Sequence, residues 1–120
     1  MTGPEGTLDA RGEARQALTS VVKDYGIRVL SNPPLLSNLF KDLLPGSPRE
    51  ANLLVAAAEG GAPTMLEQQV AGVGPDSAVR SIAANLAQER SLDPSASVWA
   101  VAEFARAMGY PVSDSVRAMP

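Results

Sequence analysis

The chain has 120 residues, of which 45% are hydrophobic and only 4% aromatic, which is the composition of one globular domain with an aliphatic core. Its ten basic and thirteen acidic residues are interspersed and give a formal net charge of −3, which argues against a nucleic-acid partner because phosphates require a basic face. Cys and His are absent, which excludes disulfides, zinc sites built from Cys or His, and Ser-His or Cys-His nucleophilic catalysis.

Proline predicts where the helices begin, because it is tolerated at the first helical position and disfavoured further in. Five prolines follow a plausible cap or a glycine break, and they are Pro33, Pro48, Pro63, Pro75 and Pro94. With one helix before the first of them, they predict six helices. At the third helix, Ser47 followed by Glu50 has the spacing of a capping box.

The predicted helices, in chain order, span about residues 8–30, 33–44, 48–59, 63–71, 75–90 and 94–108. The first places apolar residues, Tyr25 among them, on one face at helical spacing, although Gly26 lies inside it. The third is apolar nearly all round, which is typical of a central helix, and the sixth ends at Gly109. No stretch shows strand alternation, so we predict an all-α, compact six-helix antiparallel bundle with helices three and six near the middle.

The predicted helix positions divide the chain into a disordered N-terminal tail (1–7), a single helical domain (8–110) and a linker or C-terminal tail (111–120). The ending VSDSVRAMP is typical of a linker and indicates a domain of a longer protein. The first 15 residues carry acids and no apolar core, unlike a signal peptide, and no apolar run is long enough to span a membrane. We therefore expect a cytoplasmic protein without a membrane partner.

The second helix contains a stretch, Phe40 to Leu44, that resembles a short L-x-x-L-L docking peptide. Its apolar residues recur every four positions, which is equally the pattern of a core-facing helix. A small domain with few aromatic residues needs that face for its own core, so we interpret the stretch as core.

Catalytic chemistry has little support in the residues. The acidic side chains stand singly along the predicted helices, and no metal-binding or phosphate-binding motif is present. Residues 66–82 have the pattern of a helix-turn-helix, but its second helix would offer DNA phosphates only Arg80 and Arg90. The pI of the chain, near 4.8, also argues against DNA binding. We expect neither an enzyme nor a cofactor, and no nucleic acid.

Trp99 lies at the edge of the apolar arc of the sixth helix, next to Glu103 and Arg106, and two interpretations are open. In the simpler one, Trp99 packs against the first helix and adds area to a thin core. In the other, a half-exposed Trp99 stacked with Arg106 anchors a protein interface.

The first helix provides a second candidate surface, since Arg11, Arg15, Lys23 and Arg28 all lie on it. These cations either form i,i+4 pairs that favour solubility, or make a charge-complementary, head-to-tail contact with acids of a like domain.

Several apolar positions and turns together resemble a known module across about residues 14–110. They include Tyr25-Gly26, Asn32-Pro33, Leu43-Leu44-Pro45-Gly46, Ala58-Glu59-Gly60-Gly61, Leu92-Asp93-Pro94, Val98-Trp99-Ala100-Val101 and Ala107-Met108-Gly109. This pattern is similar to that of the bacterial death-like, or effector-associated, helical domains of actinobacterial multidomain signalling and conflict proteins.

The resemblance implies a death-fold-like bundle and an adaptor that recruits or clusters an effector through contacts with a similar helical domain. It implies no catalytic residue. An alternative of a different class is a small regulatory domain that binds a ligand or acts in cis on an attached enzyme. An apolar pocket with convergent polar groups would favour that alternative.

Overall fold

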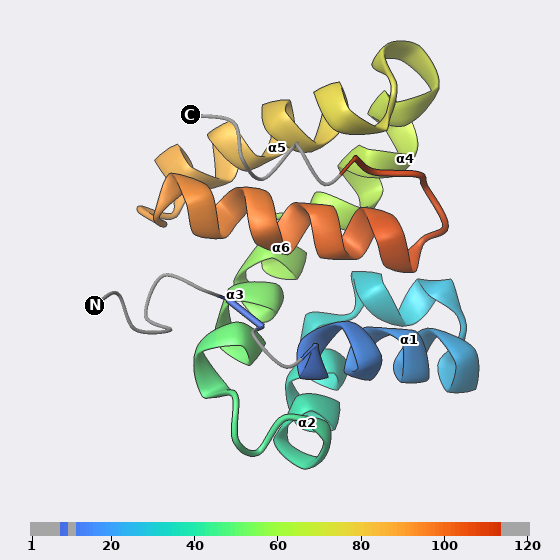
Figure 1. Ribbon diagram of the computed structural model, residues 1–120, viewed down its shortest axis with the longest axis vertical. Helices are drawn as coiled ribbons and strands as arrows, with labels where there is room; N and C mark the ends of the chain where they lie inside the picture. Colours follow the sequence, from blue (N-terminus) through green and yellow to red (C-terminus); the bar gives the residue numbers. More distant parts are fainter. Residues whose placement is uncertain (1–7, 10–11, 114–120) are drawn as a thin grey trace.

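Six α-helices and one short 3-10 helix form the described part of the computed structural model, which covers residues 8–9 and 12–113 (Figure 1). Their bounds are α1 (Glu13–Tyr25), η2 (Ile27–Ser31), α2 (Pro33–Leu43), α3 (Pro48–Glu59), α4 (Ala62–Val73), α5 (Pro75–Glu89) and α6 (Pro94–Ala107). These residues contain no strand, which confirms the predicted all-α helical bundle. The predicted tails at 1–7 and 114–120 lie outside the described residues.

The predicted proline starts are confirmed. Four helices begin at a proline, and α4 begins one residue before Pro63. Two of these starts are also capped by a side chain: Asn32 accepts a hydrogen bond from the Leu35 N–H at 3.3 Å, and Asp93 accepts one from the Ala96 N–H at 2.9 Å. Proline and cap together fix these starts, because each removes or satisfies an N–H that has no partner within the helix.

The predicted capping box at the start of α3 is wrong, because both of its side chains bond to a distant segment instead. The Ser47 hydroxyl donates to Oε1 of Glu13 at 2.9 Å, and Oε2 of Glu50 accepts from the Asp9 N–H at 3.0 Å. Asp9 in turn caps α1, since its Oδ1 accepts from the Ala14 N–H at 2.7 Å. The first turn of α3 is therefore tied to the beginning of α1.

The predicted first helix, 8–30, is wrong at both ends. The helix begins at Glu13 and ends at Tyr25, because Gly26 takes a φ of 89°, which is open to glycine and rare for other residues. The Gly26 N–H still donates to the Val22 carbonyl at 2.8 Å, and the chain then turns into η2. This change of direction buries Val29 and Leu30, and it leaves Tyr25, which was predicted to face inward, on the outside.

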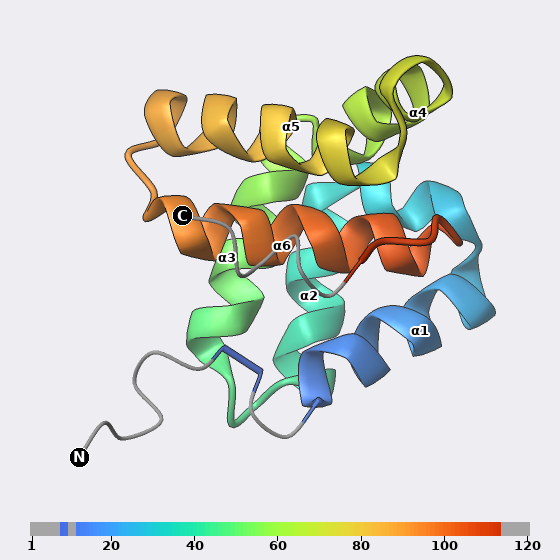
Figure 2. The same cartoon turned by 45° about the horizontal axis from the view of Figure 1, so that its top comes forward.

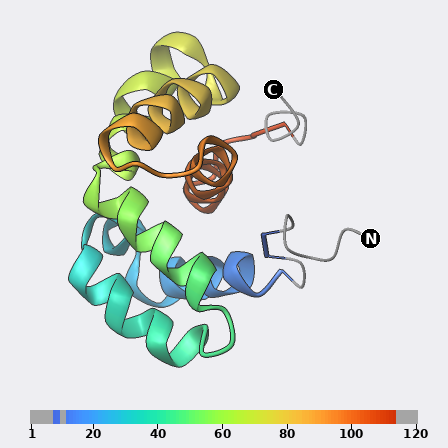
Figure 3. The same cartoon turned by 90° about the vertical axis from the view of Figure 1, so that its left-hand side faces the viewer.

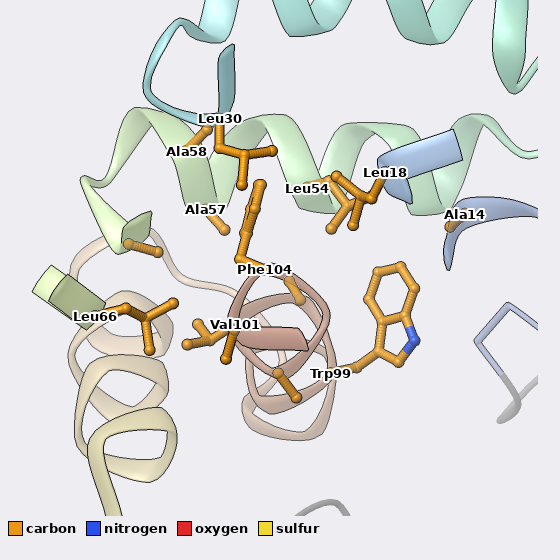
Figure 4. Close-up of a cluster of buried hydrophobic side chains, with 14 of the residues drawn as sticks. Ala14, Leu18, Leu30, Leu54, Ala57, Ala58, Leu66, Trp99, Val101 and Phe104 are labelled. Carbon is orange, nitrogen blue, oxygen red and sulfur yellow. The ribbon is translucent and has the colours of Figure 1, made fainter. Parts of the chain in front are cut away.

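α6 lies at the centre of the fold. Figure 3 shows it nearly along its axis, with α4 and α5 on one side and α1, α2 and α3 on the other. Its large side chains point in different directions, Trp99 toward α1, Phe104 toward α3 and η2, and Val101 toward Leu66 of α4 (Figure 4). Most other buried positions of α6 are Ala, and small side chains let neighbouring helices approach closely.

α3 is less central than its composition predicts. It buries one face through Leu54, Ala57 and Ala58, whereas Asn52 and Glu59 are exposed. Alanines made the helix apolar all round in the sequence, but a small alanine side chain costs little to leave partly exposed. The prediction that helices three and six share the middle therefore holds for α6 and fails for α3.

The end of α3 approaches α5 closely, while α5 and α6 run side by side in opposite directions (Figures 1 and 2). A Cβ placed on Gly60 would overlap Cδ2 of Leu86, a residue of α5 that is fully buried. Gly60 has ordinary helical dihedral angles, so its lack of a side chain serves this close approach and not a special backbone conformation.

We predict that Gly60→Ala lowers the free energy of unfolding by about 1–3 kcal/mol, because the methyl group overpacks the α3–α5 contact against the fully buried side chain of Leu86. Urea denaturation followed by circular dichroism measures this change. Gly46→Ala is the matched control, since a Cβ there meets no atom within 4 Å. Equal losses at the two positions would contradict the packing argument.

Candidate interaction surface

A buried carboxylate ties α1 to α6. Glu103 is 1% exposed, and its two oxygens accept from Nε and Nη2 of Arg15 at 3.0 and 2.8 Å. Arg106 lies one turn further along α6, with Nη1 3.5 Å from Oε2 of the same carboxylate. A charge that leaves water requires partners of this kind, and the bidentate arrangement is the strongest that arginine offers. Glu103 therefore acts inside the domain, holding α1 in place.

Trp99 is 2% exposed and packs against α1, beside Ala14 and Leu18 (Figure 4). The simpler interpretation of Trp99 is thus confirmed, and the interpretation of a half-exposed interface anchor is wrong. The physical reason is that α1 covers the edge of α6 on which Trp99 lies, so the indole adds its apolar area to the core.

Arg106 connects the central helix to the segment that follows it. Its Nη2 lies 3.4 Å from the Val112 carbonyl and 3.5 Å from the Ser113 carbonyl, and the Ser113 N–H donates to Oδ1 of Asp76 at 2.9 Å. Residues 111–113, predicted to belong to a tail, are therefore held against the start of α5. Of the predicted trio, Glu103 and Arg106 come together, and Trp99 is buried against α1, so all three belong to the internal structure of the domain.

The cations predicted on the first helix separate into different environments. Arg15 is bound to Glu103, although 49% of its side chain is exposed. Arg28 lies in η2 and is exposed, as is Lys23 in the last turn of α1. Arg11 lies outside the described residues. At the C-terminal end of α1, the exposed Lys23 is followed by the exposed Asp24, so the charges there are mixed.

Two large apolar side chains are exposed at that same end. Tyr25 is 55% exposed and Ile27 is 41% exposed, one on each side of Gly26. We call Lys23, Tyr25, Ile27 and Arg28 the α1–η2 corner, and the exposed Asp24 lies within it. Sequence reasoning missed Tyr25 and Ile27 because it continued the helix through Gly26, although the glycine itself was the signal of a break. Tyrosine and arginine are enriched where proteins bind one another.

A polar depression lies at the opposite end of α1, between its first turns and the end of α2. Its lining residues, which we call the α1–α2 hollow, are Glu13, Gln16, Ala17, Ser20, Leu43, Pro45 and Gly46. Leu43 is 42% exposed there. Asp42, the next residue back along α2, is exposed as well.

A more apolar groove lies between α2 and α3. Its lining residues, the α2–α3 groove, are Ser37, Phe40, Lys41, Leu44, Pro45, Pro48, Ala51, Asn52 and Val55. In the stretch that resembles a docking peptide, Phe40 and Leu44 are buried, as interpreted from the sequence, whereas Leu43 is exposed.

Residues 8–9 and 12–113 contain no group of three or more His, Cys, Asp or Glu side chains placed to hold a metal ion. None of the helices in this part of the chain combines the length and the apolar character needed to span a membrane.

Comparison with known proteins gives no match: no family model, curated protein or solved structure corresponds to this chain. The resemblance to death-like domains thus rests on the residues quoted for it. The function must be argued from the surface and interior of this molecule.

We predict that Arg15→Met lowers the free energy of unfolding by about 1–3 kcal/mol, because it takes two hydrogen bonds from a buried carboxylate. This loss is smaller than that expected for a fully buried ion pair, because Arg15 is half exposed. Glu103→Met should cost less, since Arg15 is half exposed and Arg106 keeps its contacts with the Val112 and Ser113 carbonyls.

Chemical denaturation of the two variants measures the difference. Arg90→Met is the matched control, because it removes a surface ion pair with Glu59, 3.4 Å long, and should cost below about 1 kcal/mol. A larger loss for Glu103→Met than for Arg15→Met would contradict this account of the cluster.

Proposed function

We propose that this chain is a non-catalytic protein–protein interaction domain of the cytoplasm, which recruits or clusters an effector through the α1–η2 corner. The observation that carries the proposal is the exposure of Tyr25 and Ile27 beside the exposed charged residues Lys23, Asp24 and Arg28. The absence of cysteine suits a reducing compartment.

The corner has the composition of an interface centre. Exposed single hydrophobic residues are ordinary, but here an aromatic and a branched aliphatic side chain are exposed on the two sides of one glycine. The flanking cations add charge at the rim, where it steers association and selects the partner. In contrast, Trp99 and Glu103 are taken up in holding the domain together and give a partner nothing to bind.

The structure around the corner is suited to rigid docking. Val29 and Leu30 anchor η2 in the core directly after Ile27, and Val21 anchors α1 before Tyr25. Side chains presented from an anchored backbone lose little conformational entropy on binding. The resemblance to effector-associated domains supports the same function, because those modules are thought to act through contacts between helical domains.

A regulatory ligand-binding domain is the second candidate, and the α2–α3 groove favours it. Its floor is apolar, and Ser37, Lys41 and Asn52 bring polar groups to the same place. Such a combination is typical of small-molecule sites. The cation at Lys41 favours an apolar ligand that carries an anionic group.

We predict that Ile27→Asp abolishes partner recovery, because it places a charge in the apolar centre of the corner. The wild-type chain, immobilised, is used to recover proteins from an extract of the cells that make it, and these are quantified by mass spectrometry. We expect the recovery of a specific partner to fall at least about tenfold with the variant, as for a residue at the energetic centre of an interface.

Val73→Asp is the matched control, since Val73 is exposed to the same degree as Tyr25 and lies outside the corner, at the end of α4. The partner, once purified, should recover the wild-type chain and Val73→Asp but not Ile27→Asp. Equal recovery with all three chains, including no recovery above background, would contradict the proposal.

For the second candidate, we predict saturable binding of 8-anilinonaphthalene-1-sulfonate, an apolar anion, measured by its fluorescence. Lys41→Ala should raise the dissociation constant about threefold, the size of one exposed ion pair. Arg80→Ala is the control and should leave it unchanged. If binding does not saturate, or does not depend on Lys41, the groove is not a ligand site of this kind.

A further inference from the structure

We propose that residues 110–113, which follow α6, occupy a binding site for an extended peptide, and that a peptide of a partner protein displaces them. We call this segment the strap. The inference goes beyond the proposed function, because the site lies where α4, α5 and α6 meet and shares no residue with the α1–η2 corner. It follows from the groups that hold the strap, from the open space beside it and from the effect of its proline.

The strap is held through its backbone. After α6 the chain turns back and runs beside that helix (Figure 2). Arg106 places Nη2 3.4 Å from the Val112 carbonyl and 3.5 Å from the Ser113 carbonyl, and Asp76 accepts from the Ser113 N–H at 2.9 Å. Every residue carries such a carbonyl, and every residue except proline carries such an N–H. A segment of another chain therefore offers Arg106 and Asp76 the same groups.

Arg106 and Asp76, which we call the clamp, are positioned by the domain and not by the strap. The Arg106 side chain is 16% exposed and contacts the buried carboxylate of Glu103 through Nη1. Asp76 is half-buried in the first turn of α5. Binding groups that are already held in place lose little conformational entropy when a peptide arrives.

The strap itself is held loosely. The two contacts from Arg106, at 3.4 and 3.5 Å, are longer than the usual N–H···O distance of about 2.9–3.0 Å. Pro111 and Ser113 are exposed, and Tyr110 and Val112 are only partly buried against the core. A modest difference in affinity is therefore enough for another segment to replace the strap.

An open depression of about 470 Å³ lies between the strap and the turn from α4 to α5. Val73 and Pro75 line one side of it, and Pro111 and Val112 line the other. The strap leaves Val73 58% exposed. A partner peptide that extends into the depression covers this apolar surface, and the gain favours the peptide over the strap.

The strap also indicates which peptides fit. A proline disfavours helical backbone at the residue before it, so Pro111 keeps Tyr110 extended. Proline itself has little conformational freedom to lose, which is why extended proline-containing segments recur as ligands. We therefore expect a partner peptide with a proline, an apolar residue and then a residue that is not proline, whose N–H reaches Asp76.

The test titrates the full chain with a peptide that has the sequence of residues 109–113, Gly-Tyr-Pro-Val-Ser, acetylated and amidated at its ends. Binding is followed by NMR chemical shifts. In the wild type the strap competes at the high effective concentration of a tethered segment. Ser113→Pro removes the N–H that the strap donates but leaves Asp76 intact, so the dissociation constant of the peptide should fall about tenfold.

Val112→Asp is a second way to release the strap, because it places a charge at a partly buried position. It should lower the dissociation constant of the peptide in the same direction as Ser113→Pro. Circular dichroism verifies that each variant is folded.

The site is checked from both partners in the Ser113→Pro chain. A peptide with N-methylserine lacks the N–H and should bind about tenfold more weakly, and adding Asp76→Ala to the chain should weaken the unmodified peptide equally. Asp42→Ala is the matched control, since Asp42 is an exposed acid on α2. Neither Asp42→Ala nor Ile27→Asp should change the affinity.

Two results would overturn the inference. Equal dissociation constants for the wild type and both strap variants, or no binding to any of them, mean that the strap covers no peptide site. Binding that survives Asp76→Ala places the peptide elsewhere on the molecule. Neither result bears on the corner, whose function is judged by the dependence of partner recovery on Ile27, and failure of the corner leaves the strap site standing.

Discussion

The ion pair between Arg15 and Glu103 is the interaction on which the arrangement of the surface depends. It joins α1 to the central helix, and α1 carries the hollow at one end and the corner at the other. Arg15 lies in the first turn of α1, so the pair fixes the end of the helix that carries the hollow, and Val21 is buried nearer the other end. Trp99 adds apolar area to the same contact. A charged group buried in this way costs solvation energy, so its contribution is better understood as orientation than as net stability.

The positions of proline in the sequence were enough to predict where most of the helices begin. Each proline has a local effect, removing an N–H and fixing φ, that no tertiary contact can reverse. The starts at Pro33, Pro48, Pro75 and Pro94 follow from this. Gly26 carried a signal of the same kind, but glycine permits a break and does not impose one. Whether α1 continues was decided by the burial of Val29 and Leu30, which is a property of the whole fold.

The candidate surface was harder to predict, because exposure depends on which helix covers which. Trp99 lies at the edge of an apolar arc, and the arc alone does not say whether α1 will cover that edge. Ser47 and Glu50 show the same limit, since their spacing fits a local cap but their partners come from a segment some 40 residues away. Long-range pairing of polar groups overrides a local motif when it satisfies the same groups and also joins two helices.

A corner of four side chains gives a modest affinity by itself, and this suits an adaptor. Binding must offset the loss of translational and rotational freedom, so a small contact between single domains holds only briefly. When several copies are brought together, each further contact forms at a high effective concentration, and weak contacts add up to a stable cluster. A domain of this kind therefore responds to crowding of its copies more steeply than a tight dimer would. Val21, Val29 and Leu30 attach the corner to the core, and in the proposed adaptor this attachment keeps each weak contact specific.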